Sequence, residues 1–458
     1  MAPGKPGGGR PHEPDCPSDP GGYGLLSRLR RSMDRHRPPG VPLRRRWRSP
    51  LRGPWLTSVF GTVLLIGLPI MIITGLLSYM AYAPRFGQAL PAHVGWLKLP
   101  TFDWPSRPAW LYRLTQGVHV GLGLVLVPVV IAKLWSVIPR LFIWPPARSI
   151  AQVLERISLV MLVGGILFEI ATGLLFIQYD MIFWFPWHTA HYFGAWVFIA
   201  GFLIHIALKI PKMVRGLRSM SMRKVLRTNR EDTRPEPHRP DGLVADDPVA
   251  ATMSRRGVLA LVGGSALGVA ILTAGQTIGG ITRQTVLFLP RGRTHNDGPD
   301  DFPINKTAAA AGIDLAAIGA AWRLTLTGGS GPVVLDRAAL AAMPQHTARL
   351  PIGCVQGWST TQTWSGVRLA DLAAAAGVRA PLSARVQSLQ KIADNRIGDY
   401  SHAVLQANQV LDRDAMLALR VNGVDLSLDH GYPARIIVPA LPGVHNTKWV
   451  SSIDFQAR

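Results

Sequence analysis

The sequence predicts a multi-domain protein: an α-helical membrane bundle of four helices plus a fifth anchoring helix, followed by an extracytoplasmic α+β domain. The first observation is composition, since 48% of the 458 residues are hydrophobic and the mean hydropathy is +0.19, which is high for a soluble chain. The second is a set of five long apolar runs. The third is a C-terminal segment of short alternating runs separated by turns.

The charge pattern favours a membrane over other partners. Lys and Arg outnumber Asp and Glu by 49 to 27, which gives a net charge of +22, although only 17% of residues are charged. The basic residues lie in blocks beside apolar runs, as the positive-inside rule describes. We therefore expect contact with membrane lipid and no binding of nucleic acid. The two cysteines, Cys16 and Cys354, are too few for a disulfide framework, a four-cysteine zinc site or an iron–sulfur cluster.

Each apolar run is long enough to cross a bilayer at 1.5 Å per residue. The expected spans are Trp55–Met80, about Trp110–Val137, Ile157–Ile177, Phe183–Ile210 and Gly257–Ile281. The expected domains are a disordered basic cytoplasmic tail (1–52), a four-helix transmembrane domain (53–212), a cytoplasmic linker (213–252), a fifth transmembrane helix (253–283) and an outer domain (284–458).

Basic residues also predict the orientation of the spans. The segment from Lys209 to Arg239 holds ten Lys and Arg, and the loop between spans two and three carries Arg140, Arg148 and Arg156, whereas the loop after span three has only Asp180. The positive-inside rule then places the N-terminus and the linker in the cytoplasm. Span five carries the C-terminal domain to the outer side.

The start of span five has a second feature. Ser254-Arg255-Arg256-Gly257, followed by a Gly/Ala-rich apolar run, resembles a twin-arginine export signal. The alternative is that two arginines flank the cytoplasmic end of a helix. Both readings agree with a multi-pass protein of a bacterial cell membrane whose C-terminal domain is extracytoplasmic.

Histidines inside the spans predict a haem site. An ionisable residue in a span is costly and is a functional hypothesis by default. His119 in span two and His191 in span four lie at similar depth near the outer face. Two imidazoles facing each other across a four-helix bundle are what a bis-histidine haem b needs. The alternative is that each histidine bonds a neighbouring carbonyl or lines a polar pocket.

An internal repeat supports the haem interpretation. Span one ends with Thr74-Gly75-Leu76-Leu77 and span three with Thr172-Gly173-Leu174-Leu175, so the helix pair looks duplicated. Small residues let a flat macrocycle approach the backbone, and Gly117, Gly121 and Gly194 lie beside the two histidines.

A second haem is less well supported. His205 lies 14 residues after His191, about 21 Å deeper in the helix. The matching position after His119 is Lys133, so we expect one haem, and His205 marks a second site only with an unusual partner ligand. His188 is an alternative ligand or an interface residue. Glu169 either accepts a proton from a quinol or pairs with Lys133.

Residues of about 50–215 are similar to the bacterial di-haem b-type cytochromes that serve hydrogenases and formate dehydrogenases as quinone-reactive membrane anchors. The resemblance rests on the span count, the histidine placement and the repeated Thr-Gly-Leu-Leu. It implies haem b as cofactor and quinone or quinol as partner. The missing second histidine pair is a departure from the family.

The outer segment reads as an α+β domain. Trp322–Thr327 alternates as a strand and Arg435–Pro439 reads as a buried strand, whereas Asp336–Met343 and Leu369–Ala376 read as short helices. Its only cysteine, Cys354, lies between glycines before a Trp-Ser pair, which suits close approach of a ligand. The alternatives are a small buried hydrophobe and a thiolate nucleophile with His430 or His445 as its base.

Three blocks make this domain resemble the molybdopterin-binding domain of the sulfite oxidase family. They are Cys354-Val355-Gln356-Gly357-Trp358-Ser359 with Thr363–Leu369, then Val421–Leu426 with Asp429–Arg435, then Gly443 with Lys448-Trp449. The resemblance implies that Cys354 ligates molybdenum and that His430, Arg435 and Lys448 contact the pterin. Phosphate recognition by Arg and Lys fits those roles.

Two departures concern substrate and cofactor. Sulfite oxidases have an Arg-rich sequence after the cysteine, whereas Val355–Trp358 is closer to the periplasmic branch that reduces methionine sulfoxide. The region before Trp322 is short, so Arg291, Arg293, His295 or Asn305 would have to supply further pterin contacts.

The combined interpretation is an oxidoreductase with Mo-molybdopterin and haem b, acting on a small substrate such as a sulfoxide or sulfite. The alternatives are a non-enzymatic membrane protein with a metal-free binding or sensing domain, and a stand-alone haem b quinone or ferric reductase.

Overall fold

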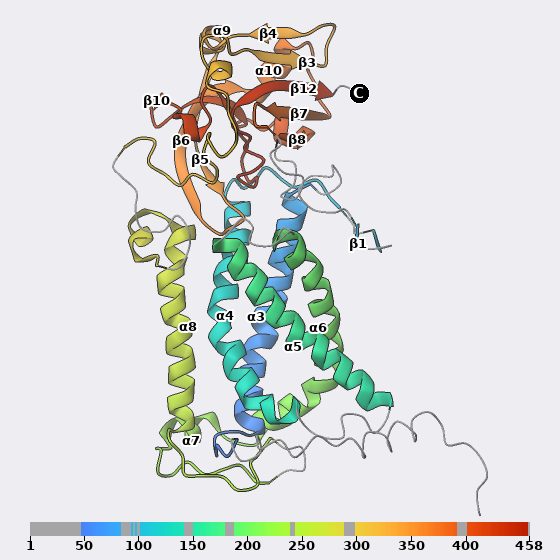
Figure 1. Cartoon of the computed structure of the whole chain (residues 1–458), viewed down its shortest axis with the longest axis vertical. Helices are drawn as coiled ribbons and strands as arrows, with labels where there is room; N and C mark the ends of the chain where they lie inside the picture. The colour runs from blue at the N-terminus through green and yellow to red at the C-terminus, as the bar shows by residue number, and fades with distance from the viewer. Residues whose placement is uncertain are drawn as a thin grey trace, which may run out of the picture.

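The computed structural model describes residues 47–83, 93–94, 97–98, 101–141, 150–178, 187–238, 243–287, 298–391 and 401–456. Most of the expected disordered tail, with Cys16, lies outside these residues, as do Arg148, Asp180, Arg291, Arg293 and His295. Within them, a group of long helices lies below a domain of strands (Figure 1).

All five apolar runs are helices. They are α3 (Pro54–Ala81), α4 (Leu111–Leu141), α5 (Ile150–Gln178), α6 (Trp187–Arg218) and α8 (Arg255–Ile278). Each is long and apolar enough to cross a membrane. Large apolar side chains face outward, for example Ile66 at 63% and Val160 at 72% exposure, which is compatible with lipid around them.

The four helices α3 to α6 form the bundle, and α8 stands beside α4 (Figure 1). Beneath them, α7 (Met222–Arg227) and the linker close the bundle. Glu236 accepts a hydrogen bond from the backbone N–H of Trp55 at 3.1 Å, which satisfies a free donor at the start of α3. Arg255 donates to the carbonyl of Arg234 at 2.9 Å, so the first of the twin arginines packs against the linker.

The C-terminal domain, for which we keep the name outer domain from its expected position, contains two five-stranded sheets. In the first, the strand order is β10-β9-β6-β5 and β11 pairs with β9; in the second, the order is β4-β3-β12-β7-β8. Only the β12–β3 pair is parallel among the described strand pairs of the two sheets. The strands are β3 (Leu324–Thr327), β4 (Val333–Leu335), β5 (Gln345–Gly353), β6 (Ser359–Arg368), β7 (Ser383–Ser388), β8 (His402–Gln406), β9 (Met416–Val421), β10 (Val424–Asp425), β11 (Arg435–Ile437) and β12 (Val450–Gln456).

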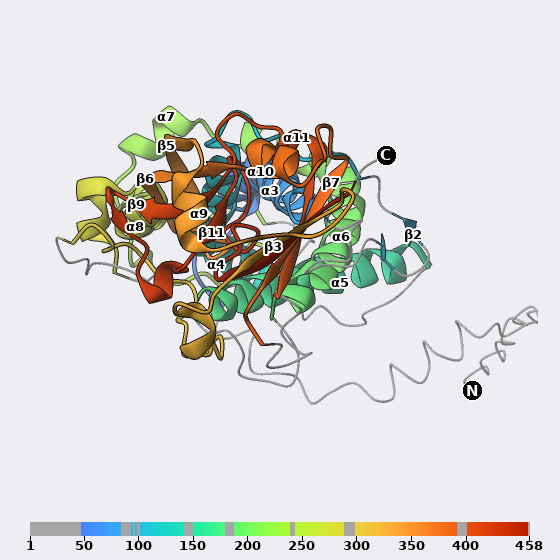
Figure 2. The ribbon, with the colours of Figure 1, turned by 90° about the horizontal axis from the view of Figure 1, so that it is seen from above.

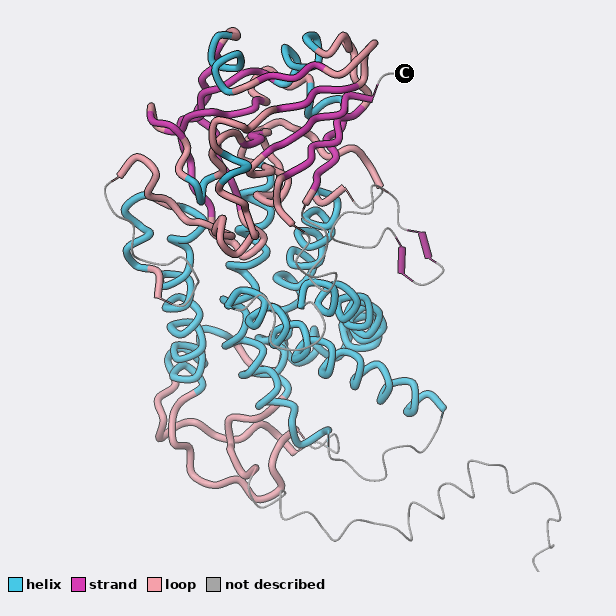
Figure 3. Tube along the Cα trace, turned by 45° about the horizontal axis from the view of Figure 1, so that its top comes forward, coloured by secondary structure: helices cyan, strands magenta, loops and turns pink. Residues whose placement is uncertain are grey.

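Short helices connect these strands, and the two expected ones are present as α9 (Arg337–Ala342) and α10 (Leu369–Ala375). Asp336 caps α9 by accepting from the N–H of Ala339 at 2.8 Å. The remaining elements are η2 (Gly280–Thr285), η3 (Ala316–Ile318), α11 (Ala407–Val410), η4 (Leu428–His430) and the separate pair β1 (His93–Val94) and β2 (Leu97–Lys98), which Figure 3 shows apart from the two sheets.

The core of the outer domain lies between its sheets and continues into the bundle. Leu326 of β3, Leu417 of β9 and Phe455 of β12 are fully buried in one cluster. The same cluster includes Tyr82 at the end of α3 and Tyr112 in α4. From above, the outer domain covers the ends of α3 and α4 (Figure 2). The two halves therefore share buried apolar surface, the main favourable term in association.

The segment before α4 connects the helical bundle to the outer domain through hydrogen bonds and ion pairs. Trp104 Nε1 donates to the carbonyl of Ala440 at 2.7 Å. Arg107 forms ion pairs with Asp412 at 2.8 Å and Asp414 at 2.5 Å. We call Trp104, Arg107, Asp412 and Asp414 the latch. It joins positions about 300 residues apart in the chain.

Candidate functional site

Cys354 lies in a tight turn between the antiparallel strands β5 and β6. Its N–H donates to the carbonyl of Trp358 at 2.9 Å, and the N–H of Gly357 donates back to the Cys354 carbonyl at 3.0 Å. Gly357 has a φ of +91°, a conformation that glycine adopts without strain. The sequence Cys-x-x-Gly therefore folds into a turn that presents the half-buried thiol at one end of the sheet. We call residues 353–359 the cysteine turn.

Next to the cysteine turn lies a pocket with three basic side chains. His430, Arg435 and Lys448 are all at least 90% buried. The full lining is Phe302, Pro303, Ile304, Asn305, Ile352, Cys354, Trp358, Thr360, Asp429, His430, Arg435, Gly443 and Lys448. The structure thus brings all four predicted residues of this site together.

Arg435 is held by neutral groups. It donates to the carbonyls of His430 at 3.0 Å and Asn446 at 3.2 Å and lies 5.1 Å over the ring of Trp364. Its Nε is buried without a partner among the described residues. Burial lowers the pKa of Arg435 to about 9, because removing a cation from water penalises its charged form.

Lys448 and His430 are the other two basic side chains of this pocket. Lys448 Nζ donates to the carbonyls of Asp429, at 3.0 Å, and Lys306. The ring of His430 lies between Ser427 Oγ, 2.8 Å from Nδ1, and the Phe302 carbonyl, 3.2 Å from Nε2. Burial, followed by the charge of Arg435, lowers the pKa of His430 to about 4. His430 is therefore neutral at pH 7.

These residues fit a phosphate-bearing cofactor with a thiolate-bound metal. A buried cation is expensive unless an anion compensates it, and the guanidinium of Arg435 donates to the carbonyl oxygens of His430 and Asn446. The carboxylate of Asp429 also lines the pocket, but its Oδ1 accepts from the N–H of Ala308 at 2.8 Å. Asn305 lines the pocket as expected. Asp429 lies in the second family block but was given no role, and Phe302 was missed because no motif marks it.

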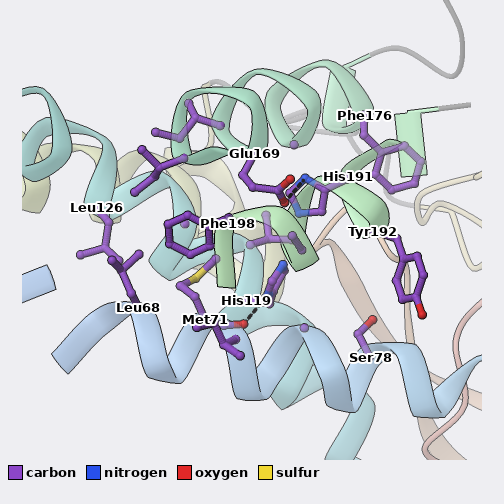
Figure 4. Close-up of a pocket in the computed structure, with 18 of the residues that line it drawn as sticks. Leu68, Met71, Ser78, His119, Leu126, Glu169, Phe176, His191, Tyr192 and Phe198 are labelled. Carbon is purple, nitrogen blue, oxygen red and sulfur yellow. Dashed lines mark hydrogen bonds and ion pairs between the residues drawn. The ribbon is translucent and has the colours of Figure 1, made fainter. Parts of the chain in front are cut away.

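The second site is a cavity among α3, α4, α5 and α6. His119 and His191 face each other there, with ring centroids 6.2 Å apart and ring planes at 89° (Figure 4). The cavity has a volume of about 220 Å³ and is lined mainly by apolar side chains of the four helices. His188 also lines it, stacked on Phe176 at 5.1 Å. We call it the histidine cavity.

The Thr-Gly-Leu-Leu repeat explains how the two rings are held. His119 Nδ1 donates to the carbonyl of Met71 at 3.0 Å and lies 3.3 Å from Thr74 Oγ1. His191 Nδ1 lies 3.0 Å from Thr172 Oγ1, which itself donates to a carbonyl. These bonds favour the proton on Nδ1 and leave the lone pair of Nε2 available, which is the arrangement found in metal-binding histidines.

The glycines of the repeat make room for the rings. A Cβ at Gly75 would lie 2.9 Å from Cε1 of His119, and a Cβ at Gly173 would lie 3.4 Å from Cε1 of His191. By contrast, Gly117 faces Thr277 of α8, where a Cβ would lie 2.2 Å from its Cγ2. The prediction that Gly117 makes room for a macrocycle was therefore wrong, because this face of α4 packs against α8.

Glu169 and Lys133 do not pair. Glu169 Oε2 lies 3.1 Å from His191 Nδ1, as Figure 4 shows. Lys133 Nζ donates to the carbonyl of Thr57 at 2.6 Å. His205 does not line the histidine cavity. The donor set of the cavity therefore fits one bis-histidine haem.

Comparison with known proteins defines the class of the outer domain. Residues 312–458 match the family model described as the oxidoreductase molybdopterin binding domain. Cys354 and the three basic residues of the pocket lie inside this range. The outer domain is a molybdopterin-binding oxidoreductase domain.

More particularly, this domain is of the sulfite oxidase type. The chain is 29% identical over 152 residues to mitochondrial sulfite oxidase of Drosophila melanogaster. This alignment covers 29% of this chain and 26% of the Drosophila protein. It is 30% identical over 125 residues to the uncharacterized oxidoreductase YuiH of Bacillus subtilis. This alignment covers 27% of this chain and 59% of YuiH. The sulfane dehydrogenase SoxCD structure from Paracoccus pantotrophus aligns at 26% identity and a TM-score of 0.27, over 32% of this chain and 40% of its own. The chain thus spans about a quarter of the Drosophila protein and three fifths of YuiH.

Proposed function

We propose that the protein is a membrane-bound, molybdopterin-dependent oxidoreductase that passes electrons between the quinone pool and a small outer substrate such as a sulfoxide or sulfite. Haem b in the histidine cavity would exchange the electrons with quinone. The observation that carries the proposal is the position of Val355. It follows Cys354 in the chain and lines the histidine cavity, whereas Cys354 lines the basic pocket, so neighbouring residues of one turn reach the two sites.

The cofactors supply oxygen-atom transfer at molybdenum and one-electron exchange at haem iron. The chain supplies their surroundings. Arg435 and Lys448 would neutralise the pterin phosphate, Cys354 would bind molybdenum as a thiolate, and His119 and His191 would hold the haem iron.

The electron balance closes in either direction. Oxidation of one quinol releases two electrons and two protons, which reduce one sulfoxide to a sulfide and water. In reverse, sulfite and water give sulfate, two protons and two electrons, and these convert one quinone to a quinol. Glu169, whose Oε2 lies 3.1 Å from His191 Nδ1, would exchange protons with quinone.

We propose a multi-pass protein in a bacterial membrane, with a cytoplasmic N-terminus and linker and an extracytoplasmic outer domain. The five apolar helices and the basic residues between them support this placement. The twin-arginine-like sequence at Arg255 supports export of the outer domain with its cofactor already inserted.

The direct test is cofactor analysis of protein purified in detergent. We expect one molybdenum and one haem per chain. In addition, either a sulfoxide should reoxidise the dithionite-reduced haem or, in the reverse assay, sulfite should reduce the oxidised haem. A preparation with haem but no molybdenum would favour the stand-alone quinone or ferric reductase. A preparation with neither would favour the non-enzymatic membrane protein.

A further inference from the structure

The cysteine turn rests on one face of helix α4. A Cβ at Gly353 would lie 3.2 Å from Cδ1 of Tyr112, and a Cβ at Gly357 would lie 2.8 Å from Cγ1 of Val120. Tyr112 and Val120 are eight residues apart, so they lie on the same side of the helix two turns from each other. Glycine at both positions therefore lets the turn approach the helix closely.

Helix α8 holds the turn from a second side. Thr277 Oγ1 donates to the carbonyl of Gly357 at 2.7 Å, and Ser359 Oγ donates to the carbonyl of Thr277 at 2.7 Å. Arg113 of α4 also donates to the Thr277 carbonyl, at 3.0 Å. The ends of α4 and α8 thus form one docking surface for the turn.

Gln116 lies at the centre of this surface, midway between Tyr112 and Val120. Its Nε2 donates to the carbonyl of Val355, and its side chain is buried. Gln116 and Val355 both line the histidine cavity with His119, which is three residues further along α4. One hydrogen bond therefore joins the residue after Cys354 to the helix that carries a histidine of the cavity.

We propose that Gln116 is a positioning residue that holds the cysteine turn over the histidine cavity, and that electrons cross between the two halves at the Val355 contact. The inference rests on the proposed function, because crossing requires both cofactors. The two electrons from one quinol would pass here to the outer site and reduce one sulfoxide, with two protons, to a sulfide and water. No diffusing carrier is needed, since docking keeps the two sites permanently adjacent.

The test compares Gln116→Met with Thr115→Val in the full-length protein in detergent. Gln116→Met keeps the length of the side chain and removes the donor to Val355. Thr115→Val is the matched control, because the partners of Thr115 Oγ1 among the described residues are carbonyls of its own helix, at Leu111 and Tyr112. Both variants should retain the haem spectrum and the molybdenum content of the parent.

The first readout is amide hydrogen exchange of the cysteine turn. We expect exchange protection of 353–359 to fall about tenfold or more in Gln116→Met, because a buried carbonyl loses its donor. Thr115→Val should leave it unchanged. Unchanged protection in Gln116→Met would overturn the positioning role, whether or not the protein holds haem.

The second readout separates two electron donors. Turnover driven by quinol should fall about tenfold or more in Gln116→Met, the order expected when a partner shifts by about an ångström. Turnover driven by a soluble viologen radical, which reaches the outer domain directly, should stay within about twofold. Equal loss with both donors would overturn the crossing at Val355. If the parent shows no quinol-driven turnover, the proposed function fails, while hydrogen exchange still decides the docking.

Discussion

Arg435 offers the sharpest test of the cofactor pocket, because its replacement should affect occupancy and stability differently. Arg435→Met keeps much of the side-chain volume and removes the charge. Burial lowers the pKa of Arg435 to about 9, which corresponds to a cost of roughly 5 kcal/mol for keeping the cation charged at neutral pH. The substitution relieves that cost in the cofactor-free protein.

The same substitution leaves the carbonyls of His430 and Asn446 without their donor. Each unsatisfied buried group costs about 1–3 kcal/mol. The two effects nearly cancel, so the free energy of unfolding of the cofactor-free protein should change by no more than about 3 kcal/mol. A charged hydrogen bond to phosphate is worth about 1.5–3 kcal/mol, so affinity for the cofactor should fall by roughly tenfold to a hundredfold.

The assay measures molybdenum per polypeptide by mass spectrometry, and denaturant unfolding of protein made without the cofactor. Arg337→Met is the control. Arg337 lies 5.1 Å over the ring of Tyr432 and pairs with Asp425 at 2.8 Å, but it does not line the pocket. Parental molybdenum content in Arg435→Met would refute the anion-binding role. Loss of more than about 5 kcal/mol from the cofactor-free protein would show that Arg435 is chiefly structural.

Three further predictions concern other parts of the molecule. Cys354→Ser should abolish substrate turnover and leave the haem spectrum intact; retained turnover would exclude the thiolate as metal ligand. His191→Ala should remove the haem absorbance and His205→Ala should keep it; the reverse pattern would move the haem deeper into the bundle. Burial raises the pKa of Asp414, but hydrogen bonds from Arg107 and His346 outweigh this effect and lower the pKa. The latch should therefore hold above about pH 4 and weaken as the pH falls further. Limited proteolysis would measure this change, with Asp414→Asn as the acid-insensitive control.

Helices and motifs were visible in the sequence because their signals are local. The five helices follow from the length of the apolar runs, and Cys354 was found from its neighbours within a few positions. The repeat around Thr74 and Thr172 also predicted duplication, although only the structure shows that each threonine holds a histidine. Local patterns of this kind survive folding because they depend on backbone periodicity and short-range bonds.

The arrangement between the halves was not visible in the sequence. Arg107 meets Asp412 across 305 residues, and Gln116 meets Val355 across 239. Neither pair carries a spacing rule, because both contacts depend on how folded domains pack. The role of Phe302 in the pocket could not be predicted for the same reason, because this loop residue reaches the ring of His430 only in the folded domain.

The inner level of the bundle is filled by Lys133 rather than by a second histidine. Its Nζ bonds the Thr57 carbonyl, and a Cβ at Gly61 would lie only 3.1 Å from that nitrogen, so small residues make room for a structural cation.

The remaining histidine pair lies at the end of the bundle that meets the cysteine turn. A quinol oxidised beside Glu169 would then release its protons near the outer face, where reduction of a sulfoxide consumes two protons. We therefore expect turnover in sealed vesicles to generate no membrane potential, measured with a voltage-sensitive dye against an added ionophore as control. A potential that builds up with turnover would place quinol oxidation at the opposite end of the bundle.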